Sequence, residues 1–353
     1  MKTSKNYSFL LIICLGLFIA SCSTTSTSVQ VLVPAEITVP HHIKKLAIAN
    51  RSLPAKGEQF SNFIEGFLTG ESIWGDKEGS KRCIEGLANK LNSSPRFGAT
   101  ISHTSLKGTG TREFSVPLQW NMVNNICKQY NADALILLET FDSNIAFKTD
   151  KKTKKQKIKN KETGISKDTI ITEYLANLII NVNAGWRIYD PVNKKIIDED
   201  SFIDEKRWGK TGKSPEDVER KLPPKRDAIN SAGYFAGQQF AIRISPNWRN
   251  VARYYYIKGP NNYFKMAKNY ARAGNWDKAM DFWEKLTPNP NHKIAGRASH
   301  NMAVANEMKG NLKQALKWAN IAYQEHNIRK DRSYVNAISR RIMDQDKLKE
   351  QME

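Results

Sequence analysis

The sequence predicts two folded domains, an α/β sheet domain over residues 31–246 and an all-α helical repeat domain over residues 261–345. Apolar strands that alternate with amphipathic helical segments predict the first domain, because each hydrophobic period matches one type of element. Two similar segments, which begin at Tyr263 and Ser299 and are thus 36 residues apart, predict the second, since such periods are typical of helical repeats. Residues 247–260 are expected to connect the two domains.

The N-terminus is predicted to be an export signal. Two lysines precede an apolar stretch over residues 9–20, which is shorter than the about 20 apolar residues that a membrane-spanning helix needs. We therefore interpret residues 1–21 as a signal peptide that is removed on export. Residues 22–30 are rich in serine and threonine and are expected to form a flexible tether, because small polar residues cannot pack a core.

The end of this signal, Ile19-Ala20-Ser21-Cys22, resembles the lipobox of bacterial lipoproteins. The resemblance implies that Cys22 carries acyl chains such as palmitate and becomes the mature N-terminus. Two or three chains anchor a protein firmly, since each buried methylene contributes about 0.8 kcal/mol. Ser23 stands where lipoproteins of the inner membrane carry an aspartate, so the resemblance implies an anchor in the outer membrane, on its periplasmic face.

The chain is strongly basic. Its 55 Lys and Arg against 35 Asp and Glu give +20, and loss of Lys2 and Lys5 with the signal leaves about +18. Such a balance favours anionic surroundings, such as phospholipid headgroups or lipopolysaccharide. Nucleic acid is excluded as a partner, because an exported lipoprotein rarely meets it. No second apolar stretch is long enough to span a membrane.

The first half of the sheet domain is predicted to alternate strands and helices. The helical segments carry apolar residues at i, i+4 and i+8, which places them on one face. The expected elements are a strand over 45–50, a helix over 77–91, a weaker strand over 97–104 and a helix over 118–130. Cys83 and Cys127 lie on the two apolar helix faces, so we expect buried free thiols, although an oxidising periplasm would permit a disulfide.

The second half is predicted to hold the longest strands. Residues 134–138 are continuously apolar, as in a central strand covered on both faces. Apolar residues alternate with mostly polar ones over 176–188, which indicates a long strand with one buried face. The turn at 190–193 leads into a return strand over 195–202. A last helix, 225–244, is expected to turn four residues inward, namely Ile229, Ala232, Ala236 and Phe240.

Over roughly residues 40–245, this order of elements resembles the α/β domain of curli-secretion lipoproteins, of penicillin-binding-protein activator lipoproteins and of the N-terminal part of the Tol-system β-propeller protein. The first strand, the helix that leads into Asn131–Ile136 and the hairpin turn Tyr189–Asn193 carry this likeness. More closely, the chain resembles an uncharacterised family of Gram-negative envelope lipoproteins that pair such a domain with helical repeats. The segments Pro34–Ile37, Ile43–Ser52 and Gly185–Asp190 carry that likeness.

Residues 148–167 are expected to form an extended, mobile loop between two strands. Their lysines repel one another and the segment has few apolar residues. Such a loop would contact an anionic surface, at about 1 kcal/mol per lysine near a charged membrane, or would simply be solvated. The candidate contacts are Lys151, Lys152, Lys154, Lys155, Lys157 and Lys159.

The two segments 36 residues apart resemble the tetratricopeptide repeat. The resemblance implies small residues where the two helices of a pair approach, and a glycine in the turn between them, where φ is positive. The matching residues are Ala267, Gly274 and Ala279 in the first copy and Ala303, Gly310 and Ala315 in the second. Because two repeats bury too little surface to be stable alone, the helix after Asp331 is expected to cap the stack.

The sequence offers little sign of catalysis. The histidines are scattered, and no HExxH, CxxC, nucleophile-elbow or phosphate-loop motif is present, so we expect no metal, no cofactor and no enzymatic activity. Acidic residues do gather over 198–205, where carboxylates raise one another's pKa. They are expected to keep an edge strand soluble. An alternative is a glycan-processing hydrolase that uses Asp198 with Asp204 or Glu205.

These observations favour a lipid-anchored envelope protein that binds other envelope proteins through its repeat and acts as a scaffold in envelope assembly or secretion. The function is inferred from the repeat fold by analogy. One alternative is the hydrolase. Another is a binder of anionic glycolipid or polysaccharide through the lysines of 148–167. The oligomeric state is left open.

Overall fold

The structure is a computed structural model that describes residues 23–53, 70–109, 113–159, 164 and 166–353. The signal peptide and Cys22 lie outside the described residues. The chain divides into two compact units. The sheet unit comprises Pro34–Asn247 with Glu350–Glu353, and the helical unit comprises Trp248–Lys349 with the described residues up to Val33. The mixed α/β sheet domain and the helical C-terminal region predicted from the sequence are confirmed at this level.

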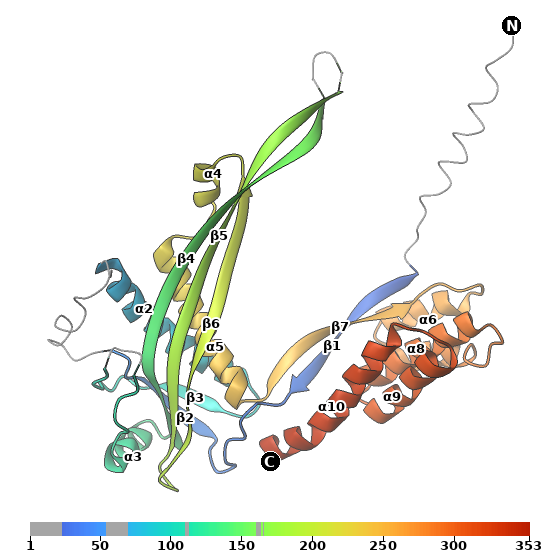
Figure 1. Ribbon diagram of the computed structural model, residues 1–353. Helices are drawn as coiled ribbons and strands as arrows, with labels where there is room; N and C mark the ends of the chain where they lie inside the picture. Colours follow the sequence, from blue (N-terminus) through green and yellow to red (C-terminus); the bar gives the residue numbers. More distant parts are fainter. Residues whose placement is uncertain (1–22, 54–69, 110–112, 160–163, 165) are drawn as a thin grey trace. The chain divides into compact units, whose positions relative to one another are not determined.

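The sheet unit is built on one five-stranded sheet with the strand order β3-β2-β4-β5-β6 (Figure 1). β2 pairs in parallel with β3 and with the start of β4, whereas β4, β5 and β6 run antiparallel. The strands are β2 (Lys45–Asn50), β3 (Gly98–Ile101), β4 (Ala134–Lys159), β5 (Ser166–Asp190) and β6 (Lys195–Gly212). Residues 134–138 are fully buried in the middle of the sheet, as their continuous apolar run predicts.

Helices cover both faces of this sheet. Successive side chains of a strand point to opposite faces, so Leu46 and Ile48 contribute to the core under α2 (Gly70–Asn92) and α5 (Lys225–Ile244). Ala47 and Ala49 contribute to a second core under α3 (Trp120–Gln129). The short helix α4 (Pro215–Glu219) follows β6. The four inward residues expected on the last helix, from Ile229 to Phe240, are all buried.

Helices α2 and α5 approach each other closely because glycines line their contact. A Cβ on Gly86 would lie 2.0 Å from the carbonyl oxygen of Tyr234, and one on Gly237 would lie 1.8 Å from that of Cys83. A Cβ on Gly233 would likewise lie 2.3 Å from the carbonyl oxygen of Gly79. Backbone atoms cannot give way like the end of a side chain, so these positions require glycine.

The loop predicted over 148–167 was wrong for residues 148–159 and 166–167, which form strands, and residues 160–163 and 165 lie outside the described residues. Residues 148–159 continue β4, and β5 pairs with them in unbroken register as far as Lys159 opposite Ser166. β6 ends at Gly212, opposite Tyr174. Lys152–Lys159 and Ser166–Glu173 therefore form a two-stranded extension of the sheet, which together with Lys151 at its base is here called the basic ribbon (green in Figure 1).

The helical unit combines a two-stranded sheet with a series of helices. Its strands are β1 (Thr24–Val33) and β7 (Asn247–Tyr256). Its helices are α6 (Tyr263–Arg272), α7 (Trp276–Glu284), α8 (His292–Met308), α9 (Leu312–Asn320), the π-helical turn η1 (Ile321–Glu325) and α10 (Asp331–Met352). None of the helices in the described part of the chain is long and apolar enough to span a bilayer.

The expected tether and connector are strands. Residues 24–33 form β1 rather than a flexible tether, and the amide of Ile257 donates a hydrogen bond to the carbonyl oxygen of Ser23. The connector expected over 247–260 contributes β7 as the partner of β1. The alternation of threonine, serine and valine in β1 suits a strand, since β-branched residues pack well on a pleated surface.

The glycine contact between α2 and α5 yields a direct test. We expect Gly237→Ala to lower the free energy of unfolding by about 2 kcal/mol, because its methyl group would overlap the backbone of α2. At an uncrowded helical position the same change stabilises by about 1 kcal/mol. Thermal and urea unfolding of the mature chain would measure the difference. Gly98→Ala, where nothing lies within 4 Å of the added Cβ, should be nearly neutral. Equal losses of unfolding free energy in the two variants would contradict a requirement for glycine at position 237.

Candidate functional site

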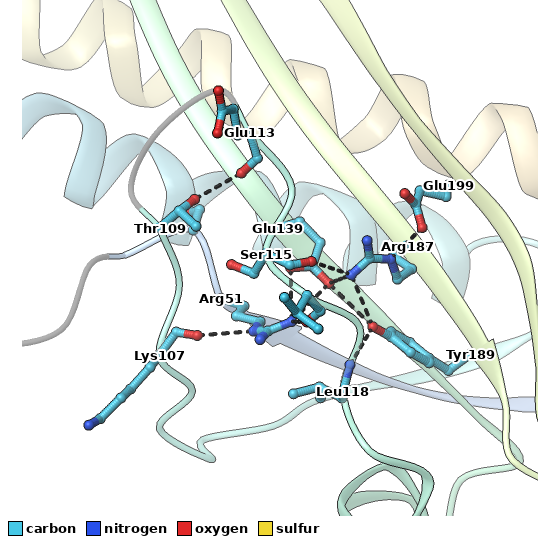
Figure 2. Close-up of polar contacts among 12 residues, drawn as sticks. Arg51, Lys107, Thr109, Glu113, Ser115, Leu118, Glu139, Arg187, Tyr189 and Glu199 are labelled. Carbon is cyan, nitrogen blue, oxygen red and sulfur yellow. Dashed lines mark hydrogen bonds and ion pairs between the residues drawn. The ribbon is translucent and has the colours of Figure 1, made fainter.

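A cluster of buried charges lies on the sheet unit, where residues 113–119, which lead into α3 and are here called the connector, cross the strands (Figure 2). The guanidinium of Arg187 donates through Nη1 to Oε1 of Glu139 at 2.8 Å and through Nε to Oε2 of Glu199 at 2.7 Å. Nη1 of Arg51 lies 3.3 Å from Oε2 of Glu139. The side chain of Glu139 is completely buried and that of Arg187 is 2% exposed. One carboxylate is thus held between two guanidinium groups.

Strand register brings these residues together. Glu139 follows the buried run of β4, at the register shift between Leu138 and Thr140, and Arg187 of β5 lies opposite Leu137. Glu199 of β6 is the direct partner of Arg187 in the next strand pair. No local sequence pattern shows that these residues meet. The sequence indicates only that Glu139 and Arg187 are charged residues within otherwise apolar stretches of their strands.

The cluster holds the connector against the sheet. Arg187 Nη1 donates to the carbonyl oxygen of Ser115 at 3.1 Å, and Arg51 Nη1 donates to that of Val116 at 2.8 Å. The amide of Leu118 donates to the hydroxyl of Tyr189 at 3.0 Å. Buried guanidinium groups therefore find their acceptors both in carboxylates and in the backbone of the connector, as buried charges require.

The segment Gly185–Asp190 takes part in this arrangement at several positions. A Cβ on Gly185 would lie 2.9 Å from the ring of Phe114, so the glycine leaves room for the connector. The ring of Trp186 stacks on Phe240 of α5 with centroids 4.6 Å apart. Asp190 accepts hydrogen bonds from the amides of the following turn. One short segment thus contacts the connector, the covering helix and the turn.

Burial and charge act in opposite directions on this cluster. Burial raises the pKa of Glu139, although the positive charges of Arg187 and Arg51 oppose that rise. Burial works to lower the pKa of Arg187, but bonds to Glu199 and Tyr189 and the charge of Glu139 outweigh it, so the pKa is raised. Glu139 is enclosed between the guanidinium groups of Arg187 and Arg51, so we interpret its carboxyl as a structural group.

An open cavity of about 530 Å³ lies near the turn between β5 and β6. Its lining includes Cys127 and His42, and Nε2 of His42 lies 3.2 Å from Oδ2 of Asp190. Burial raises the pKa of the Cys127 thiol to about 11, so it is a poor nucleophile at neutral pH. Among the described residues, no group of three or more His, Cys, Asp and Glu is arranged to hold a metal ion.

Both described cysteines are free and buried, as expected. Cys83 belongs to the core under α2 and α5, and Cys127 to the core under α3, so they lie on opposite faces of the sheet. Burial raises the pKa of Cys83 well above its usual value.

The carboxylate pair of the hydrolase alternative does not form. Asp198 and Asp204 are six residues apart along β6, which amounts to about 20 Å, whereas paired glycosidase carboxylates lie about 5–10 Å apart. Glu205 points to the opposite face of the strand from both. Asp198 lies 3.9 Å from Nε of Arg243, and burial raises the pKa of Asp204 to about 6. The pairing of carboxylates that the hydrolase alternative requires is therefore not present among these residues.

The six candidate lysine contacts all lie on the β4 strand of the basic ribbon. Lys151, Lys155, Lys157 and Lys159 share one face of the strand, and Lys152 and Lys154 lie on the other. Lys154 forms an ion pair with Glu173 of β5 at 3.4 Å. Ile158 and Ile170 are exposed on the same ribbon. The structure thus presents a two-sided basic surface with some apolar side chains, rather than a loop.

The repeat residues occupy equivalent places in the two helix pairs α6–α7 and α8–α9. The four alanines, Ala267, Ala279, Ala303 and Ala315, are completely buried. Gly274 and Gly310 lie in the turns with φ of 75° and 79°, where other residues would be strained. The side chain of Asn275 accepts from the amide of Lys278 and caps α7.

A second buried ionic cluster lies in the helical unit. Glu307 of α8 accepts from Nε and Nη2 of Arg253 on β7 at 2.7 and 2.9 Å, and from the hydroxyl of Tyr334 on α10 at 2.7 Å. Arg341 of α10 pairs with the same carboxylate. Burial raises the pKa of Tyr334 and the charge of Glu307 adds to that rise. This cluster, which no local sequence pattern predicts, joins β7, α8 and α10.

His300 forms a further link within the helical unit. Its Nε2 donates to the carbonyl oxygen of Tyr254 at 2.8 Å, and its Nδ1 lies 2.8 Å from Oδ1 of Asp331. Its ring stacks on that of Tyr254 with centroids 4.5 Å apart. A histidine that seemed isolated in the sequence is thus a buried structural residue.

Two family models match this chain. The model of the family described as domain of unknown function DUF8603 matches residues 43–256. A second model, domain of unknown function DUF6340, matches residues 265–343. No curated protein matches the sequence.

Two similar solved structures have low scores. A PelC dodecamer from Paraburkholderia phytofirmans is 11% identical with a TM-score of 0.20, over 61% of this chain and 98% of that one. A putative neuraminyllactose-binding hemagglutinin homolog from Helicobacter pylori is 15% identical with a TM-score of 0.24, over 59% of this chain and 87% of that one. Scores this low support no inference about this chain.

The buried cluster of the sheet unit predicts an asymmetric response to mutation. We expect Glu139→Gln to lower the free energy of unfolding by about 3–5 kcal/mol, because it removes the buried negative charge between the guanidinium groups of Arg187 and Arg51. Glu173→Gln, which removes the exposed partner of Lys154, should cost less than about 1 kcal/mol. Urea unfolding of both variants would measure this. Similar losses would mean that Glu139 is not essential to the cluster.

Proposed function

We propose that this chain, which belongs to the family described as domain of unknown function DUF8603, is a lipid-anchored envelope protein that holds other proteins and catalyses no reaction. The helical unit is the proposed binding part. The proposed location is the periplasmic face of the outer membrane, and the proposed setting is envelope assembly or secretion.

The stacking of the two helix pairs is the observation that carries this proposal. Met302 and Ala305 of α8 share one core with Phe264 and Ala267 of α6 and with Trp283 of α7. Glycine turns separate the helices of each pair, as described above. Helix pairs stacked in this way resemble tetratricopeptide repeats, and such stacks present extended surfaces for protein partners. The link from fold to function is an analogy.

The lipid anchor is proposed from the sequence around Cys22. Ser23, the next residue, already accepts a hydrogen bond from the amide of Ile257 next to β7. A lipid on Cys22 would therefore be attached directly to the folded helical unit, without a long tether. This arrangement supports a role in which bound proteins are kept close to the membrane.

The anchor can be tested by changing one residue. We expect Cys22→Ala to abolish labelling by radioactive palmitate and to move the protein from the membrane fraction to the soluble periplasmic fraction, because the acyl chains supply the membrane affinity. Immunoblots of separated fractions and fluorography would measure both effects. Ser23→Ala should keep its lipid. Labelling and membrane association that survive in Cys22→Ala would refute the anchor.

A second candidate function is binding to an anionic glycolipid or polysaccharide through the basic ribbon. The described strands of the ribbon, Lys151–Lys159 and Ser166–Glu173, carry seven lysines against Asp168 and Glu173. The ribbon extends past the end of β6, so lysines on both of its faces can approach a charged surface. The exposed Ile158 and Ile170 would add apolar contacts.

Vesicle binding tests whether the lysines of the ribbon contribute more to binding than other exposed lysines do. In the soluble Cys22→Ala form, we expect Lys151, Lys155 and Lys157 changed together to glutamine to reduce binding to vesicles with anionic lipid by about 100-fold at low salt, since each lysine contributes about 1 kcal/mol. Co-sedimentation would measure the binding. The same change at Lys293, Lys313 and Lys317, three exposed lysines of the helical unit, is the matched control. Equal losses in both variants would reject a specific role of the ribbon.

A further inference from the structure

Helix α6 exposes an apolar stripe. Tyr263, Met266 and Tyr270 follow one another at i, i+3 and i+7, which places them on one side of the helix, and they are 38%, 42% and 38% exposed. The ring of Phe282 on α7 lies beside both tyrosines, with centroids 6.0 Å from Tyr263 and 5.7 Å from Tyr270. Large side chains from two helices therefore form one exposed apolar surface, here called the α6 face.

The same positions are buried in the second helix pair. One period of 36 residues later they are Ser299, Met302 and Asn306, all of which are buried. Met302 belongs to the core shared with the first pair, and Nδ2 of Asn306 lies 3.6 Å from the sulfur of Met280 on α7. In α8 this face packs against the preceding helix pair.

The α6 face is thus the open end of the stack. In the described part of the helical unit, no helix precedes α6. Because neighbouring repeats bury each other's apolar faces, the surface that α8 buries against α7 is left uncovered in α6. Its shape suits another helix, since the equivalent surface of α8 is occupied by one.

Charge restricts which helix can bind there. α6 carries three basic residues, Lys265, Lys268 and Arg272, and no acidic one. The ammonium of Lys285 lies 5.6 Å from the ring centroid of Phe282 and 5.9 Å from that of Tyr263, at the border of the same surface. A second copy of this chain would bring two such basic surfaces together, which like-charge repulsion disfavours. An acidic helix would be attracted.

We propose that the α6 face binds an amphipathic helix of another envelope protein, with small or aliphatic residues on the side that meets Tyr263, Met266 and Tyr270 and with aspartate or glutamate at its borders. The proposal rests on the proposed function and specifies the partner's chemistry. The partner helix extends the stack by occupying the position that α7 occupies against α8. The lysines around the face select for acidic borders.

A designed peptide pair tests this chemistry. The probe is a fluorescent 18-residue helix with alanine and leucine on one side and glutamate along the borders, and its twin carries lysine in place of every glutamate. Fluorescence anisotropy with the mature chain in its soluble Cys22→Ala form should show at least tenfold tighter binding of the acidic peptide. Met266→Asp should weaken that binding at least tenfold, because it places a charge in the apolar stripe.

Controls exclude simpler explanations. Met343→Asp, at an exposed methionine of α10, should bind the acidic peptide like the unmodified chain, and circular dichroism should be the same for both variants. Equal binding of the two peptides, or equal binding by Met266→Asp and Met343→Asp, would overturn the proposal. Sedimentation should show a monomer. A dimer that Met266→Asp dissociates would assign the face to a second copy and would also overturn it.

A photo-crosslinking residue placed at 266 or at 343 in the full, anchored chain separates the two proposals. Crosslinks at 266 to an acidic helical segment, mapped by mass spectrometry, would support the assignment. Crosslinks to proteins from position 343 or from other surfaces, with none from 266, would overturn the α6 face and leave the scaffold proposal standing. The absence of protein crosslinks from every surface tested would count against both.

Discussion

The buried contact between Glu139 and Arg187 links the three long strands of the sheet unit to one another and to the segment that crosses them. It joins β4 to β5, reaches β6 through Glu199, and fixes the connector that crosses these strands. A buried ion pair adds little net stability over well-packed apolar residues, yet removing one partner is costly. Its role is therefore to fix one arrangement of the connector rather than to supply most of the folding energy.

The helical unit contains the same combination of groups. Glu307 lies between Arg253 and Arg341 and accepts from Tyr334, as Glu139 lies between Arg51 and Arg187 near Tyr189. In each unit one carboxylate joins elements that are far apart in the sequence. In the sheet unit, this interaction holds the connector against the strands. In the helical unit, it holds β7, α8 and α10 together.

Sequence patterns predicted those elements whose apolar residues follow a regular period along the chain. The central strand at 134–138, the alternation over 176–188 and the helix over 225–244 follow from hydrophobic period alone. The basic ribbon and β1 were missed because charge and polarity were given more weight than cross-strand pairing. Lys154 and Lys155, which lie opposite Ile171 and Ile170, are accommodated in a strand because their partner residues are β-branched.

The site residues differ in the same respect, since some contacts are local in the sequence and others are distant. The alanines and glycines of the repeat could be located from their spacing, because the two helices of one pair are close in sequence. Glu139 meets Arg187 and Arg51 across 48 and 88 residues, and Glu307 meets Arg253 across 54. No local period records such contacts. The exposed α6 face became visible only when Met266 could be compared with the buried Met302.

The pairing of β1 with β7 has a practical consequence for preparing this protein. A soluble form that starts at residue 31, where the folded domain was expected to begin, would lack most of β1. β7 would then present a row of unpaired N–H and C=O groups, which is a template for aggregation. A form that starts at Ser23 keeps the whole strand, including the bond from Ile257. The segment expected to be a mere spacer is thus needed to keep the rest of its unit dispersed in solution.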